Sequence, residues 1–388
     1  MEILNKTIQY RPGIPVEASL CRVDRALPHR HPSDLEIVCC LEGKVHLVAS
    51  DQQATLLPGQ IHSIDHEDIH YLYSDTENLV LIFHLDLKNI PYDWDQIRYV
   101  FFACESNHCY AYQQTAMDAV KDTILSFSYG YLTGDYTPEM YEGPVEFFSF
   151  YLLEYFNWFN YENQDVYMNE DLYERFHRVL AYCMDHYDQK ITISQLAAQE
   201  HISKNYFSQF ISHTVFRSFS TMIKYIRCYN AEYLLLTTDK PNAEIAYECG
   251  FSDPKYFYAA FRQLWGRTPS EHRAAYENYY RSCLEHYAKS ERSENAENAE
   301  NAKAGGVMPA DAAEGVFSDA LPVSGESHHF PLHGDEIPGQ KRLSDEDAAH
   351  VLRSVMADWH LKKTFGPEEN EQDPEAERPR TIYFAERI

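Results

Sequence analysis

Two short stretches of the sequence place polar side chains along one side of a predicted helix. In the first stretch the polar side carries Lys204, Asn205, Ser208, Gln209 and Ser212, and the opposite side carries Tyr206, Phe207, Phe210 and Ile211. In the second stretch the outward residues are Lys255, Tyr258, Ala259 and Arg262, and the inward residues are Tyr256, Phe257 and Phe261. Amides and hydroxyls that project from a helix can hydrogen-bond base edges in the major groove of DNA, and cations can contact phosphates. These side chains therefore predict DNA recognition.

A helix-turn-helix pattern positions the first set of polar residues. Thr192 and Gln195 fit a capping box that opens a helix through Ala198. After a short turn, Ser203 is predicted to cap a second helix, which begins at Lys204 and ends near His213. A tight turn followed by a helix with an outward polar side is the arrangement that enters the major groove.

The same pattern is predicted a second time, after a linking helix from about Phe219 to Leu236. Its first helix starts near Pro241, directs Ile245, Ala246 and Cys249 inward, and ends at Gly250. Ser252 is predicted to cap the second reading helix, Gly266 to end it, and Thr268-Pro269-Ser270 to open a last short helix. Two such units joined by a long helix indicate a DNA-binding domain more strongly than one, because many helical hairpins have a polar outer side.

The stretch Ile245–Phe257, continuing through Phe261-Arg262 to Gly266–Arg273, resembles the signature of AraC-type transcription regulators. The resemblance spans about Ile191–Arg273. It implies that each unit places its second helix in one of two successive major grooves. The positions that usually read bases correspond to Asn205, Ser208 and Gln209, and then to Lys255, Tyr258 and Ala259. The full DNA-binding set predicted here is Ser203, Lys204, Asn205, Ser208, Gln209, Ser252, Lys255, Tyr258, Ala259 and Arg262.

Several residues depart from the family pattern. Ser212 and His213 stand at positions that are often basic, Phe216 replaces a usual glycine, and Ala259 replaces a frequent arginine. Fewer cations mean fewer phosphate contacts and a shallower dependence of affinity on salt. We therefore expect DNA affinity to depend on dimerisation and on amide contacts to bases. The alternative for Asn205, Ser208 and Gln209 is an ordinary solvated helix face.

The distribution of charge sets one segment apart. The chain of 388 residues has a net charge of −27. Residues 190–283 contain 11 basic and 8 acidic side chains, a net charge of +3, whereas residues 1–189 contain 11 and 30 and residues 284–388 contain 11 and 22. The predicted DNA-binding segment is thus the one net-positive part, and its acidic flanks should weaken non-specific DNA binding.

The N-terminal part alternates short apolar runs with turn residues from Arg22 to about Leu87, which predicts a β-barrel or a sandwich. Within it, His29-Arg30-His31, then Glu36 and Gly43, resemble the first motif of cupin barrels, a domain that AraC-type regulators commonly carry. In metal-binding cupins these groups and a later histidine, here His70 or His62, hold a divalent ion. Val23 replaces the glycine expected ahead of the motif, and the second motif is loose around Pro58-Gly59.

Three interpretations of this motif stay open: an effector pocket without metal, a metal site, or groups that only complete the barrel. The predicted effector pocket consists of His29, His31, Glu36, His70, Tyr71 and Tyr73, and the metal candidates are His29, His31, Glu36 and His70. The tyrosines would add aromatic walls with hydrogen-bonding ends, which suits a sugar-like ligand by analogy with the family. No cofactor is expected.

The predicted fold is multidomain α+β. A cupin-like β-barrel over residues 1–110 precedes a helical linker and dimerisation segment over 111–187, an all-α double helix-turn-helix domain over 188–288, and an acidic, largely disordered tail over 289–388. Within the helical segment, 145–159 is apolar on most faces and is a candidate dimer interface or an intramolecular core. Within the tail, Ser344 is predicted to cap a helix over 344–365, either transient or a docking motif.

The remaining bulk features favour a cytoplasmic protein. The start of the sequence does not resemble a signal peptide, and no stretch approaches the roughly 20 apolar residues of a membrane span. The nine cysteines form no CxxC pair and are expected to be reduced and mostly in the core.

The leading functional hypothesis is a transcription regulator, not an enzyme, that binds double-stranded promoter DNA as a homodimer and responds to a small-molecule effector. RNA polymerase is a further candidate partner. The alternatives are a metal-dependent cupin oxygenase or isomerase, which needs a complete set of three histidines and a carboxylate, and a scaffold that acts through its acidic tail.

Overall fold

The computed structural model describes residues 1, 3–92, 97–157, 170–304 and 337–365. The strands are β1 (Leu4–Asn5), β2 (Val16–Val23), β3 (His29–Arg30), β4 (Asp34–Glu42), β5 (Val45–Ala49), β6 (Gln52–Leu56), β7 (Ile61–Ile64), β8 (His70–Tyr73), β9 (Leu79–Asp86) and β10 (Gln340–Arg342). The helices are α2 (Gln114–Thr133), α3 (Pro138–Tyr155), α4 (Glu170–Asp185), α5 (Ile193–Gln199), α6 (Lys204–Ser212), α7 (Phe219–Thr237), α8 (Asn242–Glu248), α9 (Pro254–Trp265), α10 (Pro269–Ala304) and α11 (Asp345–Phe365), with 3-10 turns η1 (Ser106–His108) and η2 (Ala111–Gln113).

The strands form two five-stranded sheets. One has the order β1-β3-β8-β5-β6 and the other β10-β2-β9-β4-β7. An apolar cluster with members from both sheets, among them Val38, Val80, Leu47 and Leu72, fills the space between them. The strand-rich N-terminal domain is therefore as predicted, but the described strands do not show a closed hydrogen-bonded barrel.

The second sheet is buried on both faces. Along β2, Ala18 and Leu20 belong to a second apolar cluster formed with α2, α3 and α11, while Cys21 belongs to the cluster between the sheets. The alternation follows from the two-residue period of a strand. Burial on both faces also explains why Leu79–Phe83 of β9 is a continuous apolar run.

The helices predicted as one middle segment belong to two different cores. Helices α2 and α3 pack against the second sheet, whereas Phe176, Val179 and Leu180 of α4 pack with the C-terminal helices. The expected linker over 111–187 is therefore divided between the domains that flank it. The candidate dimer segment 145–159 lies mostly in α3, and its residues 158–159 lie outside the described part of the chain.

The helix-turn-helix elements have the predicted order. Thr192 and Ser203 cap α5 and α6 by accepting hydrogen bonds from the backbone N–H groups of Gln195 and Tyr206. Gly250 follows α8 with φ +78°, and a Cβ there would meet the carbonyl oxygen of Tyr187, so the close approach requires glycine. Two details differ from the prediction. Asp253, not Ser252, caps α9, and the helix opened at Pro269 is long, running to Ala304.

The tail predicted to be largely disordered contains a folded segment, residues 337–365. Strand β10 pairs antiparallel with β2, and α11 packs against α2. Ser344 caps α11, as predicted, by accepting from the N–H of Asp347. The predicted apolar side of this helix is in contact: Leu352 is fully buried in the cluster beneath the second sheet, and Val351, Val355, Met356 and Trp359 pack against the same cluster. Of the two predicted roles, a transient helix or a docking motif, α11 has the second, because it docks on the N-terminal domain of its own chain.

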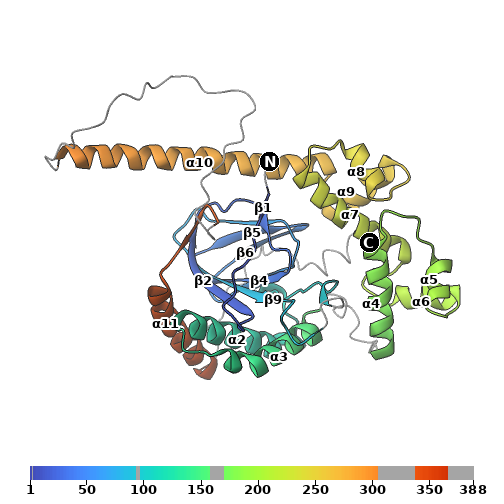
Figure 1. Cartoon of the computed structure of the whole chain (residues 1–388), viewed down its shortest axis with the longest axis horizontal. Helices are drawn as coiled ribbons and strands as arrows, with labels where there is room; N and C mark the ends of the chain where they lie inside the picture. The colour runs from blue at the N-terminus through green and yellow to red at the C-terminus, as the bar shows by residue number, and fades with distance from the viewer. Residues whose placement is uncertain (2, 93–96, 158–169, 305–336, 366–388) are drawn as a thin grey trace, which may run out of the picture.

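Figure 1 shows the arrangement of these parts: α2, α3 and α11 lie along one side of the sheets, α10 crosses the opposite side, and α4–α9 form a separate helical body. In the described part of the chain, no helix combines the length and apolar character that a membrane span needs.

Candidate functional site

The two predicted DNA-reading helices present most of the expected residues to solvent. Exposed side chains are Ser203, Lys204, Asn205, Ser208 and Gln209 around α6, and Ser252, Lys255, Ala259 and Arg262 around α9. Tyr258 differs, because it is half-buried and packs against the core of the helical body. Phe207 and Phe257, predicted to face inward, are completely buried and hold the two helices in place.

Tyr206 and Tyr256 are not inward-facing, contrary to the prediction. Their exposed fractions are 44% and 53%. Each is the third residue of its helix and directly precedes the buried phenylalanine, so the two occupy equivalent positions on the two reading helices. The ammonium of Lys255 lies 4.9 Å from the centre of the Tyr256 ring. Pattern reasoning missed these tyrosines because it treated them as apolar, although the hydroxyl makes an exposed tyrosine a hydrogen-bond donor.

In the N-terminal domain, the structure brings His29, His31, Glu36 and His70 together. His29 and His70 are register partners on β3 and β8 of one sheet, while Glu36 comes from β4 of the other. All four are buried, and their ligand atoms lie within 4.8 Å of one another. The histidine cluster, as we call these four residues, is therefore built where the two sheets meet. His62, the alternative fourth member, lies 3.1 Å from Gln52 instead.

Backbone carbonyls orient the three imidazoles. The Nδ1 atoms of His29, His31 and His70 lie 2.8, 3.1 and 2.9 Å from the carbonyl oxygens of Leu27, Lys6 and Asp68, respectively. Because a carbonyl only accepts, each Nδ1 donates its proton there, and in the neutral ring the lone pair is then on Nε2. These Nε2 atoms and Oε1 of Glu36 are buried and make no hydrogen bond. The Nε2 atoms of His31 and His70 approach Oε2 of Glu36, at 2.9 and 3.3 Å.

Burial keeps His29 and His31 neutral, and the neighbouring histidines keep the carboxylate of Glu36 ionised. Burial lowers the pKa of His29 well below its usual value and that of His31 to about 4. Burial alone would raise the pKa of Glu36, but the neighbouring His70, His31 and His84 outweigh it and hold the pKa well below the usual value. Neutral imidazoles and a carboxylate are the protonation states that a divalent cation requires, so the donor set fits a metal such as Zn²⁺ or Fe²⁺.

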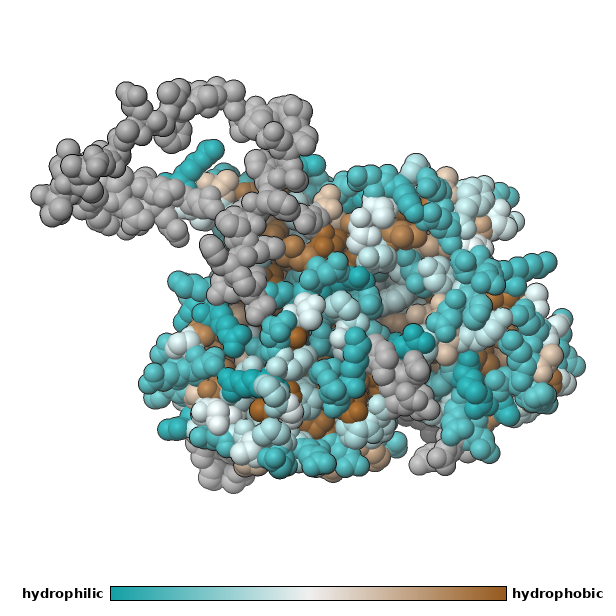
Figure 2. Space-filling view, in the orientation of Figure 1, coloured by the Kyte–Doolittle hydropathy of each residue, from teal (hydrophilic) through white to brown (hydrophobic). Residues whose placement is uncertain are grey.

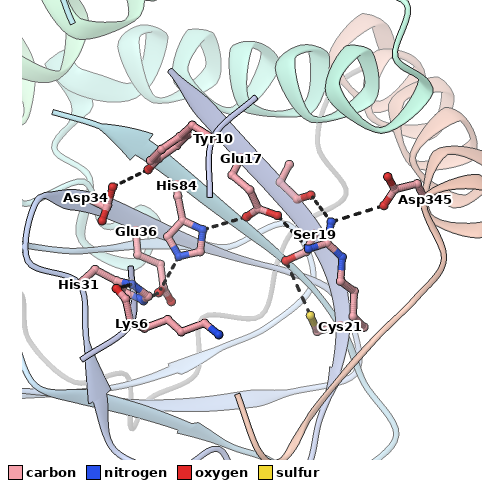
Figure 3. A network of polar contacts seen from close by, with 12 residues as sticks. Lys6, Tyr10, Glu17, Ser19, Cys21, His31, Asp34, Glu36, His84 and Asp345 are labelled. Atoms are coloured by element: carbon pink, nitrogen blue, oxygen red, sulfur yellow. Dashed lines mark hydrogen bonds and ion pairs between the residues drawn. The ribbon is translucent and has the colours of Figure 1, made fainter. Parts of the chain in front are cut away.

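A row of charged groups leads away from the cluster (Figure 3). Glu36, His84 and Glu17 are cross-strand neighbours on β4, β9 and β2. His84 Nε2 lies 3.2 Å from Glu36, and its Nδ1 lies 3.1 Å from Glu17. Although burial opposes it, hydrogen bonding to these two carboxylates raises the pKa of His84 to about 10. The sequence prediction missed Glu17 and His84, although His84 has the same inward parity as Val80 and Ile82.

Beside this row lies a cavity of about 250 Å³. Its lining includes Glu17 and His84, and also Arg342, which donates a hydrogen bond from Nη1 to Glu17 Oε1 over 3.0 Å. The remaining lining residues are Lys6, Thr7, Ile8, Gln9, Ser19, Cys21, Ile82, Tyr131, Ile337 and Gln340. A small molecule placed here would meet both charged and apolar walls.

Tyr71 and Tyr73, predicted as walls of the effector pocket, face a different partner. On β8, His70 points to the cluster, and the next residue must point to the other side of the sheet. The Tyr71 ring stacks on Tyr279 of α10, with the ring centres 3.7 Å apart, and Tyr73 lies near the same ring. The two tyrosines thus connect the sheet to α10 and do not line the cavity.

Comparison with known proteins finds relatives of the helical body among transcription regulators. A family model described as a helix-turn-helix domain matches residues 196–275. An uncharacterised regulator of Escherichia coli, YijO, is 32% identical over 103 residues, which cover 26% of this chain and 36% of that protein. The transcriptional activator RhaS of Klebsiella pneumoniae is 25% identical over 282 residues, which cover 70% of this chain and 96% of that protein.

Among solved structures, the C-terminal domain of AraT, a response regulator from Geobacillus stearothermophilus, is 30% identical and covers 26% of this chain and 84% of that domain, with a TM-score of 0.25. The first curated relatives match this chain over about a third of their own length. The residues matched by the family model are similar to a helix-turn-helix domain found in transcription regulators.

Proposed function

We propose that this protein is a sequence-specific transcription regulator that binds double-stranded promoter DNA and responds to a small molecule held in its N-terminal domain. The observation that carries the proposal is the pair of reading helices, α6 and α9, which expose polar side chains from one shared apolar core. Because that core fixes the two helices relative to each other, they can enter successive major grooves as one rigid unit.

The test is a binding assay with DNA from upstream of the protein's own gene. Gln209→Ala and Lys255→Ala should each weaken specific binding by roughly 1–3 kcal/mol if the residue contacts a base. Glu277→Ala, a change on α10 outside both reading helices, is the control and should leave the affinity unchanged. Equal affinity of both variants and the wild type for this DNA would show that neither Gln209 nor Lys255 contributes to DNA binding.

The histidine cluster favours a second candidate property, binding of a divalent metal. His29, His31, His70 and Glu36 would hold the ion, since their unpaired atoms already converge and their other ring nitrogens are fixed by carbonyls. A bound ion would supply a positive centre that could attract an anionic group of an effector. The protein would then sense the ion itself or a ligand that contacts it.

Metal analysis of the purified chain tests this candidate directly. After removal of metal with a chelator, Co²⁺ should bind with one equivalent per chain and give visible absorption bands from the His-rich site. Glu36→Gln should weaken the binding about tenfold or more, because it removes the anionic ligand. His62→Gln, outside the cluster, is the control. Wild-type protein that takes up no Co²⁺ would contradict metal binding by the histidine cluster.

The regulator is also proposed to act as a homodimer through α3. This helix buries Val145, Phe148 and Leu152 against the sheet, while Phe147 and Phe150 on its other side are 53% and 48% exposed. On the face shown in Figure 2, hydrophobic and hydrophilic residues are mixed over the α2–α3 region. Replacing Phe147 and Phe150 by glutamate should shift sedimentation from dimer to monomer; a wild-type protein that sediments as a monomer would contradict this part.

A further inference from the structure

The two exposed tyrosines of the reading helices lie on the flanks of those helices. Tyr206 of α6 and Tyr256 of α9 each directly precede a completely buried phenylalanine, Phe207 or Phe257. The residue before each tyrosine is exposed in the outward polar row. Successive residues of a helix are about 100° apart around its axis. Each tyrosine is therefore placed between the outward row and the row that packs into the core.

The hydroxyl groups of this pair are available to a ligand. In the described part of the chain, neither hydroxyl makes a hydrogen bond, and the two residues are 44% and 53% exposed. Other tyrosines in the C-terminal half behave differently, since Tyr229 of α7 and Tyr276 of α10 donate to backbone carbonyls of the N-terminal domain. Tyr206 and Tyr256 can thus donate to a bound partner without first losing a hydrogen bond within the protein.

The charges on the reading helices leave room for uncharged contacts to DNA. The ammonium of Lys255 lies 3.3 Å from a carboxylate oxygen of Asp253, the residue that caps α9. Ser212 and Ala259 stand at positions that are often basic in AraC-type regulators. Phosphate oxygens also accept hydrogen bonds from uncharged groups, among them the hydroxyl of tyrosine. Tyrosines at the edge of the groove can therefore supply contacts to the DNA backbone that cations do not supply here.

The flank of a reading helix is the side that faces the DNA backbone. The major groove is about 12 Å wide, and a helix with its side chains is about 10–12 Å across. A helix in the groove therefore has its outward row at the base edges and its flanks beside the sugar-phosphate chains. Because Tyr206 and Tyr256 occupy equivalent positions, they would meet phosphates in two successive grooves, about 10 base pairs apart.

We propose that Tyr206 and Tyr256 each donate a hydrogen bond to a DNA phosphate, one at each groove, and so position the two reading helices on the duplex. The inference rests on the proposed function, since it identifies how the same surface holds the DNA backbone. Because a phosphate carries no sequence information, these contacts strengthen binding to any duplex. Because a hydroxyl adds no positive charge, they leave the salt dependence of binding unchanged.

The first experiment measures the affinity of the full chain for the upstream fragment and for random DNA of equal length. Tyr206→Phe and Tyr256→Phe each remove one hydroxyl and should weaken binding to both DNAs by the same factor, about threefold to tenfold. The double variant should lose about the product of the two factors, since the sites are independent. Tyr112→Phe, at a 48% exposed tyrosine outside the helix-turn-helix residues, is the control and should bind like the wild type.

A second pair of variants tests whether the partner is a phosphate. Tyr256→Lys replaces the hydroxyl by a cation, which can contact the same phosphate. It should bind more tightly than Tyr256→Phe at low salt, and the slope of log affinity against log salt should steepen by about 1. Tyr112→Lys adds the same charge away from the reading helices and should keep the wild-type slope. Tyr256→Lys with the affinity of Tyr256→Phe at low salt would overturn the phosphate contact.

Ethylation of individual phosphates in the upstream fragment locates the contacts. Ethylation at one phosphate should weaken the wild type but not Tyr206→Phe, and a second such phosphate, about 10 base pairs away, should be specific to Tyr256. Unchanged affinity of both phenylalanine variants, or a loss confined to the upstream fragment, would overturn the inference, and a preference of the wild type for that fragment would still support the proposed function. Without that preference the proposed function fails, whereas weaker binding of the phenylalanine variants to random DNA would still support the tyrosine contacts.

Discussion

His84 lies between two carboxylates in the interior of the N-terminal domain, in contact with Glu17 and Glu36. A buried imidazolium is stable only when both ring N–H groups are paired with acceptors, and this geometry supplies both. His84 therefore compensates the charge of Glu36. The partners of the four buried histidines differ: His29, His31 and His70 direct Nδ1 to carbonyl oxygens, whereas both ring nitrogens of His84 face carboxylates.

Loss of the His84 proton should lower the unfolding free energy of the protein at alkaline pH. Its pKa of about 10 in the folded chain exceeds the ordinary value of 6.5. Its contribution is therefore complete below pH 6.5 and is lost as the pH rises through 10. The difference in unfolding free energy between wild type and His84→Gln should shrink by up to about 1.4 kcal/mol per pH unit between pH 7 and 10. Urea unfolding in the presence of a chelator measures it, and a constant difference across that range would contradict the assignment.

The low pKa values of His29 and His31 predict a metal affinity that depends little on pH near neutrality. With the pKa of His31 lowered to about 4 and that of His29 well below its usual value, protons do not compete for these two ligands at pH 6. Co²⁺ affinity should therefore change little between pH 8 and pH 6 and fall only on further acidification. Titration of the metal-free protein at several pH values tests this. A steep loss of affinity centred near pH 6.5 would indicate histidines with ordinary pKa values.

At the residue scale, the sequence could predict the members of the cluster but not its neighbours. The spacing of His29, His31 and Glu36 resembled a known motif, and the structure brings these residues together with His70. Tyr71 and Tyr73 were misassigned because adjacent strand residues point to opposite faces. Glu17 and His84 join the network through pairing of β2, β4 and β9. That pairing is set by tertiary structure and leaves no local signal.

At the scale of elements, α11 shows what a local pattern can and cannot indicate. Its cap at Ser344 and its apolar side were readable, because both depend on residues within the helix. Its site on α2 was not readable, because the contacts join positions more than two hundred residues apart, such as Arg353 and Tyr129. The extent of the N-terminal domain was also not readable. The composition of residues 289–388 suggested disorder, whereas residues 337–365 pack into that domain through equally distant contacts.

The burial of α11 predicts a stability cost. Leu352→Ala should lower the unfolding free energy of the N-terminal domain by about 2–5 kcal/mol, because it removes a fully buried leucine and leaves a cavity. His350→Ala, two residues earlier and exposed, should change stability by less than about 0.5 kcal/mol. Chemical denaturation measures both. Equal effects of the two changes would mean that α11 is not docked on α2 in solution.

At the scale of the whole molecule, the helical body is held against the N-terminal domain by polar and aromatic contacts. Glu232 of α7 is buried and accepts from Ser50 over 2.5 Å and from His272 over 2.7 Å. The hydroxyl of Tyr276 donates to the carbonyl of Ile69, just before the cluster residue His70. Strand β8 thus contacts the cluster through one face and α10 through the other. This is one direct structural connection between the proposed sensor and the DNA-binding domain.

Loosening this connection should release the two domains from each other. Tyr279→Ala removes the ring that stacks on Tyr71, a contact worth about 0.5–1.5 kcal/mol beyond its buried area. Hydrogen exchange should become faster in β8 and in the first part of α10, while α6, held by Phe207, should keep its protection. Equal acceleration in α6 would mean that the change destabilises the whole chain and does not act at the domain interface.

We expect the helical body to read a particular DNA sequence through two successive grooves. The most direct measurement of this reading is a competition assay at moderate salt, in which wild-type protein chooses between its own upstream fragment and random DNA of the same length, combined with a footprint of the bound site. We expect preference for the upstream fragment and protection of major-groove positions about one helical turn apart, about 10 base pairs. Equal affinity for both DNAs, with no discrete footprint, would contradict this expectation.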